Sequence, residues 1–256
     1  MSISFDQAAP YYDRTRALGE DALAQLIPVV AAELYGAGRV IEVGIGTGRV
    51  ALPLMRAGVD ITGVDISGEM LARLREKAAG SPPRVAIADA TRLPFADATF
   101  GGAIAAHVLH LIPRWTDALT EISRVTRPGG VLIASRGSRS HSDDWWARVR
   151  REFFRLAGDH PWPPGMDRIE ELDQEMRARG AVVKRLPEIA QPGSGTVNGL
   201  LALLEEGVWS ACWSIEPEER RRAASATREW AAANVGDLDQ PRPLIEVLAW
   251  RSYRLP

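Results

Sequence analysis

The chain has 256 residues, of which 46% are hydrophobic and 25% are charged, the balance of a globular protein that can build a full core. The formal net charge is -2 and the pI is about 6.1, and no basic stripe is visible, so DNA, RNA and acidic membrane surfaces are not expected as main partners. A single cysteine, the lack of a signal-peptide pattern and the lack of any run of ~18 apolar residues predict a cytoplasmic protein without disulfides or membrane insertion.

The first half of the chain alternates predicted strands with predicted helices, after a short aromatic stretch over 5–18. Apolar and β-branched runs predict strands over 39–43, 59–64, 84–88, 100–106 and 131–135. Amphipathic spacing predicts helices over 21–35, 49–56, 68–78 and 115–125, and Ser67 can cap the third of them. This alternation implies βαβ crossovers, and therefore a parallel sheet covered by helices on both faces.

The second half of the chain is mainly helical. Helices are predicted over 145–156, 166–179, 197–213 and 217–233, strands over 182–189 and 244–253, and loops over 136–144 and 191–195. Six of the eight tryptophans lie in the segments 138–164 and 196–240: Trp145, Trp146, Trp162, Trp209, Trp213 and Trp230. Their rings either shape an apolar pocket for a flat or lipid-like ligand or pack these helices onto the core.

A glycine-rich turn, Glu42-Val43-Gly44-Ile45-Gly46-Thr47-Gly48, follows the first predicted strand. Such a turn places backbone N–H groups at the carboxyl edge of the sheet, where ligands of open α/β folds bind. Glycines at this spacing also occur in dinucleotide enzymes, but here the third glycine comes early and Arg49 stands where those enzymes have their last glycine. The Glu42 carboxylate is a poor neighbour for a pyrophosphate and a good one for a cationic sulfonium that carries an ammonium.

Two further acidic residues end the next two predicted strands. Asp65 offers two oxygens that can accept both hydroxyls of a ribose. Asp89 can accept a hydrogen bond from an adenine amino group while the Ala90 N–H donates to a ring nitrogen. Either acid alone could be a turn former or a helix cap. Acids at three consecutive strand ends, with the glycine turn between them, favour an adenosyl ligand.

In series, these motifs resemble the class I S-adenosylmethionine-dependent methyltransferases, especially the branch of ubiquinone/menaquinone-biosynthesis methyltransferases. The matching pieces are VIEVGIGTG (40–48), GVDISGEML (63–71), ADA (88–90), LPFAD (93–97), VLH (108–110) and RVTRPGG (124–130), with Phe5, Asp6, Ala9, Tyr12 and Asp13 similar to the family's N-terminal segment. The resemblance covers about 5–135, roughly half of the chain. It implies an α/β fold with a Rossmann-like, doubly wound, mostly parallel seven-stranded sheet, an antiparallel last strand and helical cap insertions.

The resemblance also implies a domain organisation. We expect a single methyltransferase domain over 1–256, in which a cofactor core of about 37–136 is completed by strands near 182–189 and 244–253. The helical cap is expected over about 138–164 and 196–240. One departure from the family's pattern is Gly101, because the family usually has an aspartate after the aromatic residue that here is Phe100.

The cofactor that the resemblance implies is S-adenosylmethionine, and its contacts follow position by position. The implied contacts are Glu42, Gly44, Gly46 and Gly48 at the methionine end, Asp65 on the ribose, Ile66 and Met70 on the adenine faces, Asp89 and Ala90 at the adenine edge, Tyr12 and Arg16 over the methionine carboxylate, and the His107 backbone.

Catalytic residues are harder to assign from the sequence. His107 and His110 follow the fourth predicted strand, beside the expected methyl group, and are weak candidates for a general base. A packing or loop-fixing role is favoured for His110. A sulfonium is already an activated donor, so alignment and exclusion of water can suffice, and we assign no catalytic base. The spacing of histidines, cysteine and acids predicts no metal site.

The function expected from the sequence is S-adenosylmethionine-dependent methyl transfer by in-line displacement. The acceptor is expected to be a small apolar or aromatic molecule, attacked on O, N or C, and the protein a monomer or homodimer. One alternative is a nicotinamide-dependent oxidoreductase, against which Glu42 and Arg49 argue. The other alternative is a protein that binds S-adenosylmethionine without turnover, which intact cofactor residues do not exclude.

Overall fold

The computed structural model describes residues 2–78, 80–139 and 145–256, and the chain divides into two compact units. Unit 1 comprises Met1–Gly137, Pro164–Ile189 and Leu248–Pro256. Unit 2 comprises Ser138–Pro163 and Ala190–Val247. In the order of the chain, unit 2 is therefore built from two insertions into unit 1.

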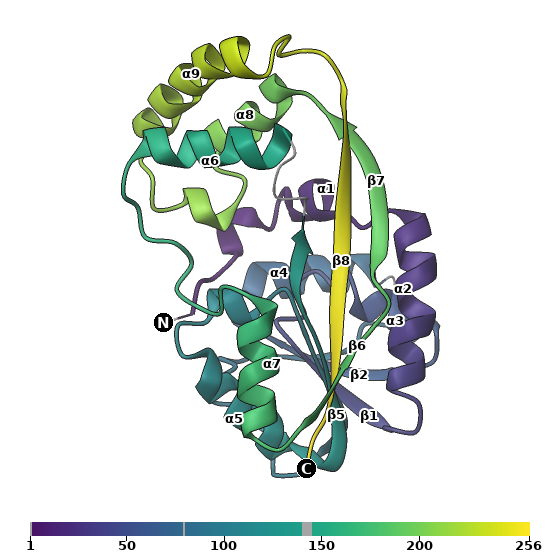
Figure 1. The fold of residues 1–256 in the computed structure, drawn as a ribbon. Helices are drawn as coiled ribbons and strands as arrows, with labels where there is room; N and C mark the ends of the chain where they lie inside the picture. Colours follow the sequence, from purple (N-terminus) through teal and green to yellow (C-terminus); the bar gives the residue numbers. More distant parts are fainter. Residues whose placement is uncertain (1, 79, 140–144) are drawn as a thin grey trace. The chain divides into compact units, whose positions relative to one another are not determined.

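The helices and strands of unit 1 follow one another in the expected alternation (Figure 1). In chain order they are η1 (Asp6–Ala8), α1 (Tyr12–Arg16), α2 (Glu20–Glu33), β1 (Arg39–Val43), α3 (Ala51–Arg56), β2 (Asp60–Asp65), α4 (Gly68–Lys77), β3 (Arg84–Ile87), β4 (Phe100–Ala106), η2 (Leu109–Leu111), α5 (Trp115–Val125), β5 (Thr126–Arg139), α7 (Ile169–Ala178) and β6 (Val182–Arg185). The predicted Ser67 cap is confirmed, since its Oγ accepts a hydrogen bond from the Met70 N–H at 3.1 Å.

The remaining elements belong to unit 2 or continue from it into unit 1. They are α6 (Trp145–Ala157), β7 (Ile189–Gly195), α8 (Val197–Glu205), η3 (Ser210–Cys212), α9 (Pro217–Asn234) and β8 (Arg242–Arg254). The single helix predicted over 197–213 is therefore two shorter ones, because Gly207 takes a positive φ of 73° between them and ends the first.

The sheet has the strand order β3-β2-β1-β4-β5-β8-β6, with β7 paired to β8 outside this path. Strands β1 to β5 pair in parallel, and β6 pairs with β8 in antiparallel register. The predicted doubly wound, mostly parallel sheet is confirmed, but the described residues form eight strands instead of seven. The additional strand arises because the predicted strand 182–189 is interrupted at Pro187, which has no N–H to donate, and Ile189–Gly195 forms β7 where a loop was predicted.

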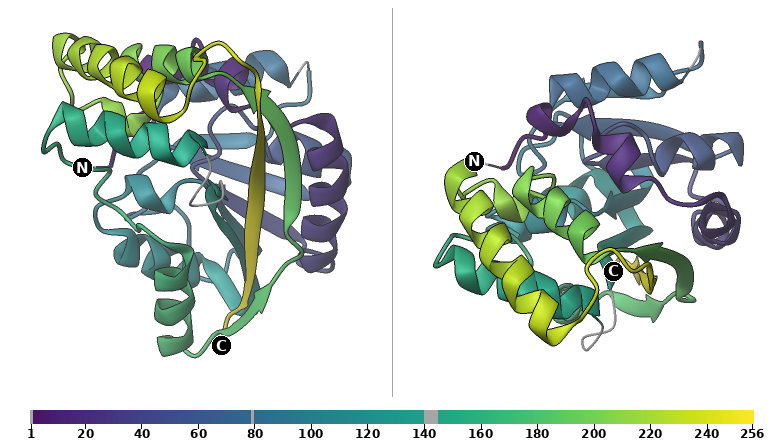
Figure 2. Two further views of the ribbon diagram at one scale, coloured as in Figure 1. Left: turned by 45° about the horizontal axis from the view of Figure 1, so that its top comes forward. Right: turned by 90° about the horizontal axis from the view of Figure 1, so that it is seen from above.

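Two apolar cores lie on the two faces of the unit 1 sheet. Helices α2, α3 and α4 cover one face, where Leu26, Leu54 and Leu74 pack with Val40 and Ile104 of the sheet. Helices α5 and α7 cover the other face and bury the second core. Figures 1 and 2 show α2 and α7 on opposite sides of the strands. Because both faces are buried, the central strands β1 and β4 are mostly apolar, as is typical of a parallel sheet.

Gly101 in β4 explains the departure from the family pattern at this position. A Cβ added to Gly101 would lie 1.9 Å from the Ala37 carbonyl oxygen, a backbone atom that cannot swing away. The register between β4 and β5 also shifts between Phe100 and Gly102. The close approach of the loop between α2 and β1, which contains Ala37, therefore excludes any side chain here, aspartate included.

We expect Gly101→Ala to lower the free energy of unfolding by about 2–3 kcal/mol, because the added methyl group overpacks against backbone. Chemical denaturation followed by circular dichroism measures the change. Gly68→Ala is the matched control, since a Cβ there would meet its nearest neighbour at an ordinary 3.7 Å, at the start of α4. An equal effect of both substitutions would contradict the steric explanation.

Unit 2 has an apolar core of its own, formed by α6, α8 and α9. Four tryptophans pack against this core as partly buried rings: Trp145, Trp146, Trp209 and Trp230. Trp213 donates its indole N–H to the Gly207 carbonyl at 2.9 Å, and Trp162 stays 59% exposed. Of the two roles predicted for the tryptophans, packing within the helical unit accounts for these contacts.

Candidate functional site

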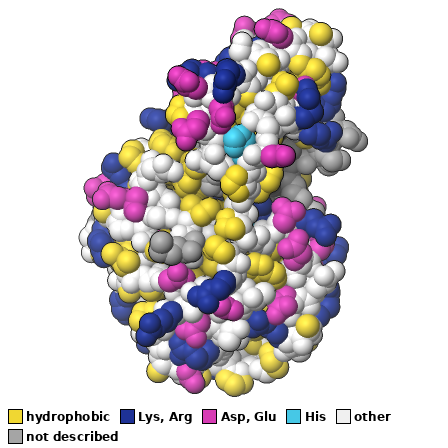
Figure 3. Space-filling model, turned by 90° about the vertical axis from the view of Figure 1, so that its left-hand side faces the viewer, with side chains coloured by type: hydrophobic (Ala, Val, Ile, Leu, Met, Phe, Trp, Pro, Cys, Tyr) yellow, Lys and Arg dark blue, Asp and Glu magenta, His cyan; other side chains and the backbone are white. Residues whose placement is uncertain are grey.

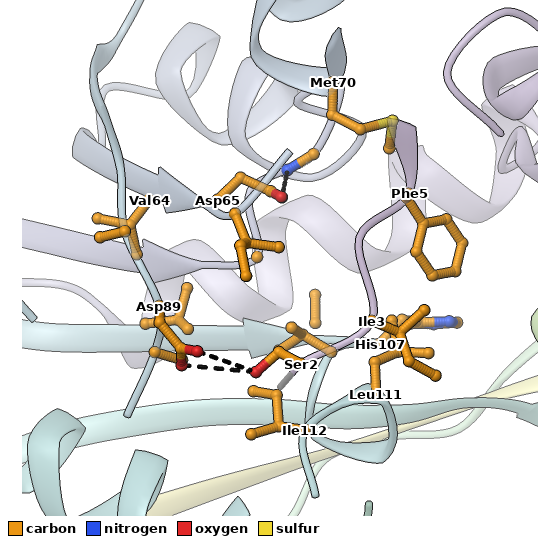
Figure 4. Close-up of a pocket in the computed structure, with 18 of the residues that line it drawn as sticks. Ser2, Ile3, Phe5, Val64, Asp65, Met70, Asp89, His107, Leu111 and Ile112 are labelled. Carbon is orange, nitrogen blue, oxygen red and sulfur yellow. Dashed lines mark hydrogen bonds between the residues drawn. The ribbon is translucent and has the colours of Figure 1, made fainter. Parts of the chain in front are cut away.

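The carboxyl ends of β1, β2, β3 and β4 surround a cavity of about 80 Å³ in unit 1 (Figure 4). Nine of the residues predicted to bind a cofactor line it: Tyr12, Gly44, Gly46, Asp65, Ile66, Met70, Asp89, Ala90 and His107. The remaining lining residues are Ser2, Ile3, Phe5, Val43, Val64, Ala88, Ala106, Val108, Leu111 and Ile112. Motifs that lie far apart in the sequence thus meet at one edge of the sheet.

The glycine turn takes a backbone conformation that side chains would oppose. Gly44, Gly46 and Gly48 have φ angles of 69°, 55° and 76°, in the left-handed region that glycine tolerates best. A Cβ on Gly44 would lie 2.4 Å from a methyl group of Val108. Val108 can therefore occupy its position in the cavity wall only because residue 44 has no side chain. The Gly44 N–H donates to the Val64 carbonyl at 2.8 Å, which joins the turn to β2.

Asp65 ends β2 and holds the turn with its carboxylate. Its Oδ2 accepts the Gly46 N–H at 2.8 Å and its Oδ1 accepts the Ser67 N–H at 2.9 Å. Burial raises the pKa of Asp65, and these backbone donors oppose that rise. Because each carboxylate oxygen has two lone pairs, both oxygens can still accept a ligand hydroxyl.

Asp89 follows β3 and lies on the opposite side of the cavity from Met70 (Figure 4). Its Oδ1 accepts the Thr91 N–H at 2.9 Å and the Thr91 hydroxyl at 2.8 Å. The Ser2 hydroxyl lies 3.4 Å from both carboxylate oxygens, a long contact. Burial raises the pKa of Asp89, but the hydrogen bonds from Thr91 and Ser2 outweigh it and the net pKa is lowered, so this acid is an anion at neutral pH.

Glu42 lies behind the turn, in the middle of the sheet, and is not among the cavity-lining residues. Its side chain is buried, and Oε2 has no hydrogen-bond partner among the described residues. Burial raises the pKa of Glu42 to about 8; the Arg49 guanidinium opposes the rise and the Asp65 carboxylate adds to it. A cationic ligand near this buried carboxyl would stabilise its ionised form.

The N-terminal segment, residues 2–16, is fastened to the loops around the cavity. The Ile3 N–H donates to the Leu111 carbonyl at 3.1 Å, and Asp6 accepts the Ser67 hydroxyl. Asp13 accepts the Thr47 hydroxyl at 2.6 Å and the Lys77 ammonium at 2.8 Å. The Phe5 and Tyr12 rings contact each other edge to face at 6.0 Å between centroids.

The sequence predicts the role of only part of this N-terminal segment. The aromatic pair Phe5 and Tyr12 carried the family's N-terminal pattern, and both residues line the cavity. Ser2 and Ile3 line it as well, but neither belongs to a motif that the sequence shows. Their positions depend on hydrogen bonds to Asp89 and Leu111, which lie far along the chain.

His107 lines the cavity with a φ angle of 57°, a left-handed backbone conformation that is strained for a residue other than glycine. Its N–H donates to the Ser135 carbonyl at 3.0 Å. Burial, followed by the nearby Arg49 guanidinium, lowers the pKa of His107 well below its usual value. The His107 imidazole is therefore neutral at pH 7, the form that can accept a proton.

His110 is not among the cavity-lining residues, and its Nδ1 is buried without a hydrogen-bond partner among the described residues. Burial, followed by Arg136 and Arg16, lowers the pKa of His110 to about 3. Besides Glu42, two of the predicted cofactor residues lie outside the lining set. Gly48 faces Leu52 and Leu74 at the start of α3, and Arg16 accepts the Arg49 guanidinium on its carbonyl oxygen at 2.8 Å.

Within residues 2–78, 80–139 and 145–256, no group of three or more histidine, cysteine or acidic side chains is placed to hold a metal ion. In the same part of the chain, no helix combines the length and the apolar character needed to cross a bilayer.

The residues at this edge of the sheet lie in the part of the chain that is similar to known proteins. Residues 41–134 match the Methyltransferase domain family. Phosphatidylethanolamine N-methyltransferase from Cereibacter sphaeroides is 42% identical over 100 residues, which are 38% of this chain and 49% of that protein. A ubiquinone/menaquinone biosynthesis C-methyltransferase from Desulfotalea psychrophila is 33% identical over 134 residues, 50% of this chain and 54% of that protein. The chain spans about half the length of these relatives.

The similarity in fold covers more of the chain than the matched residues 41–134. The crystal structure of the YcgJ protein from Bacillus subtilis aligns with 93% of this chain and 100% of its own at a TM-score of 0.62. Its identity of 17% makes this a likeness of fold alone. The glycine turn and the acidic residues Glu42, Asp65 and Asp89 lie within the residues that match the Methyltransferase domain family, and this part of the chain is similar to class I S-adenosylmethionine-dependent methyltransferases.

Proposed function

We propose that the protein transfers a methyl group from S-adenosylmethionine to a small apolar or aromatic acceptor. The observation that carries the proposal is the shared cavity of Gly44, Gly46, Asp65 and Asp89, with the buried Glu42 carboxyl behind it. Dinucleotides bring an anionic pyrophosphate to such a turn, and an anion there would keep the Glu42 carboxyl protonated and gain no attraction from it. The cationic methionine end of S-adenosylmethionine would instead favour ionisation of Glu42 and be attracted by the carboxylate that forms.

The residues present fit the cofactor at each of its ends. Asp65 would hold the ribose hydroxyls, because its oxygens keep lone pairs beyond the two backbone amides. Met70 and Ile66 would cover the adenine ring, and Asp89 would accept its amino group in place of the long contact from Ser2. When bound, S-adenosylmethionine supplies a methyl group activated as a sulfonium, transferred by in-line displacement.

The protein's own contribution would be positioning, exclusion of water and proton handling. The N-terminal segment closes one side of the cavity, which favours a dry site. His107 lines that cavity as a neutral imidazole, and its lowered pKa makes it a weak acceptor for the proton of a hydroxyl or ammonium. Unit 2, which interrupts the methyltransferase domain in sequence, would form the helical cap that selects the acceptor.

Ligand-dependent melting and methyl transfer test this proposal. We expect S-adenosylhomocysteine to raise the melting temperature of the protein and NADH to leave it unchanged. Labelled S-adenosylmethionine should then transfer methyl groups to a member of a panel of quinol, phenol, amine and fatty-acid acceptors, and product analysis identifies the attacked atom. Stabilisation by NADH alone would overturn the cofactor, and binding without transfer to any acceptor would overturn the enzymatic activity.

Glu42 gives a second, pH-dependent prediction. Its folded pKa of about 8 lies above the value of 4.5 for a free glutamate, so the free protein holds a proton on Glu42 at pH 6.5. A cationic ligand favours the carboxylate, so binding of S-adenosylmethionine at pH 6.5 should release up to one proton. Calorimetry in buffers of different ionisation enthalpy counts the protons released. Glu42→Gln should abolish the release; an unchanged proton count in that variant would contradict the assignment.

The same pKa sets the pH dependence of stability. The folded protein retains the Glu42 proton up to pH about 8, whereas the unfolded chain loses it near 4.5, so stability decreases as pH rises through this window. The expected slope in the ligand-free protein is up to about 1.4 kcal/mol per pH unit. It should be smaller in Glu42→Gln, which carries no titrating group at this position.

A further inference from the structure

Two acidic residues of the N-terminal segment, Asp6 and Asp13, bond to the two loops that carry predicted cofactor residues. Asp6 Oδ1 accepts the Ser67 hydroxyl at the start of α4, and the Glu69 N–H donates to the same oxygen at 3.4 Å. Asp13 Oδ1 accepts the Thr47 hydroxyl of the glycine turn at 2.6 Å. Both acids are at least partly exposed, whereas Ser67 and Thr47 are 0% and 1% exposed. Each acid is therefore the acceptor for a hydroxyl group that has no contact with solvent.

The Ser67 hydroxyl connects Asp6 to the predicted ribose and adenine contacts. Its oxygen accepts the Met70 N–H at 3.1 Å while the hydroxyl donates to Asp6. The Ser67 N–H donates to Asp65 Oδ1 at 2.9 Å. Asp6 is not among the residues that line the cavity, so any effect on a ligand there passes through Ser67. Hydrogen bonds behind a binding residue fix its orientation in this way.

The Thr47 hydroxyl connects Asp13 to the glycine turn. Thr47 stands between the last two glycines of the turn, and its oxygen lies 3.3 Å from the Lys77 ammonium. Lys77 ends α4 and donates to Asp13 as well, at 2.8 Å. Asp13 therefore holds the glycine turn against the end of α4, and Asp6 holds the start of the same helix.

The two acids differ from ordinary surface acids in their partners. Figure 3 shows acidic and basic side chains next to each other over one face of the molecule, and exposed pairs of this kind contribute little to stability. Glu76 and Arg73 form such a pair on α4 itself, with side chains 65% and 48% exposed. Asp6 and Asp13 instead bond to buried hydroxyl groups of the cofactor loops. We therefore expect them to affect the geometry of the cavity more than the stability of the fold.

We propose that Asp6 and Asp13 are positioning residues that hold the two cofactor loops in their binding geometry. The proposal rests on the binding of S-adenosylmethionine proposed above, and it assigns the two acids to different ends of that ligand. Asp6, through Ser67, positions the contacts to adenine and ribose, and Asp13, through Thr47, positions those to the methionine end. Without its acid, a loop adopts other positions, and a loop correctly placed about one tenth of the time lowers the apparent affinity about tenfold.

Calorimetry with two ligands tests the proposal: S-adenosylhomocysteine, and 5′-methylthioadenosine, which lacks the amino-acid end. Asp6→Ala should weaken both ligands about tenfold, whereas Asp13→Ala should weaken S-adenosylhomocysteine about tenfold and 5′-methylthioadenosine less than about twofold. Asp6→Asn and Asp13→Asn keep an oxygen for the hydroxyl group and should restore the affinity to within about twofold of wild type. Glu76→Ala is the matched control, because it removes the exposed pair on α4 and should change neither affinity.

Three results would overturn the positioning roles: unchanged affinity in both alanine variants, an equal loss in the asparagine variants, or an equal effect of Asp13→Ala on both ligands. The comparison of alanine with asparagine needs only S-adenosylhomocysteine. Ser67→Ala and Thr47→Val remove the same hydrogen bonds from the other partner and should reproduce the two patterns, which decides the question if an alanine variant is unstable. A wild-type protein that binds neither ligand would overturn the proposed function and these roles with it, whereas normal wild-type binding with unchanged variants overturns the roles alone.

Discussion

Replacing Asp65 with alanine is expected to weaken the affinity for S-adenosylhomocysteine at least tenfold. The variant would lose the two charge-assisted hydrogen bonds that we propose Asp65 makes to the ribose, each worth roughly 1.5–3 kcal/mol, and tenfold requires only about 1.4 kcal/mol. It also leaves the Gly46 and Ser67 N–H groups without their acceptor, so the glycine turn loses its support. Titration calorimetry measures the affinity directly.

Two further variants separate these causes. Asp65→Asn keeps an oxygen for the backbone donors but removes the charge, so its affinity should lie between those of wild type and alanine variant. Asp60→Ala is the matched control, since Asp60 begins the same strand, is more than half exposed, and pairs with Arg84 away from the cavity. Unchanged affinity of Asp65→Ala would refute the ribose assignment.

The second large effect is expected at Asp173, the centre of a buried polar cluster between α7 and β8. Its Oδ1 accepts the Tyr253 hydroxyl at 2.8 Å and its Oδ2 lies 3.3 Å from Arg251 Nε. Both side chains of the ion pair are 3% exposed. Asp173→Ala leaves the guanidinium buried without its counter-ion, and such losses cost about 3–5 kcal/mol.

Urea denaturation followed by circular dichroism measures the loss at Asp173. Tyr253→Phe should cost only about 1 kcal/mol, because it removes one hydrogen bond and keeps the packing of the ring. Glu175→Ala, on the same helix, removes the partly exposed ion pair with Arg179 and should change stability by less than about 1 kcal/mol. A loss below 1 kcal/mol in Asp173→Ala would mean that Arg251 finds another acceptor.

The sequence was sufficient to predict the sheet of unit 1 and most of the cavity. Gly44, Asp65 and Asp89 stand at strand ends, and parallel strands place such ends at one edge, so sequence position alone predicts their meeting. The doubly wound order followed from the alternation of strands and helices. S-adenosylmethionine was predicted as the cofactor from the series of motifs, and the match to the Methyltransferase domain family confirms that prediction.

Other features depended on contacts that sequence periodicity cannot show. The strand β7 has the composition of a loop, with Pro192 and two glycines, and becomes a strand only because β8 offers a pairing edge. Ser2 enters the cavity through a contact 87 residues away in sequence. The pKa of Glu42 depends on complete burial, which no motif specifies.

The attachment of the N-terminal segment has a consequence during synthesis of the chain. Residues 2–16 are synthesised before the residues that hold them, because partners of Asp6, Asp13 and Ser2 come 61, 64 and 87 residues later. At roughly 5–20 residues per second, these partners emerge several seconds or more after the segment itself. The nascent chain therefore carries Phe5 and Tyr12 without these contacts until β3 has been made, and the cofactor cavity closes only after that point.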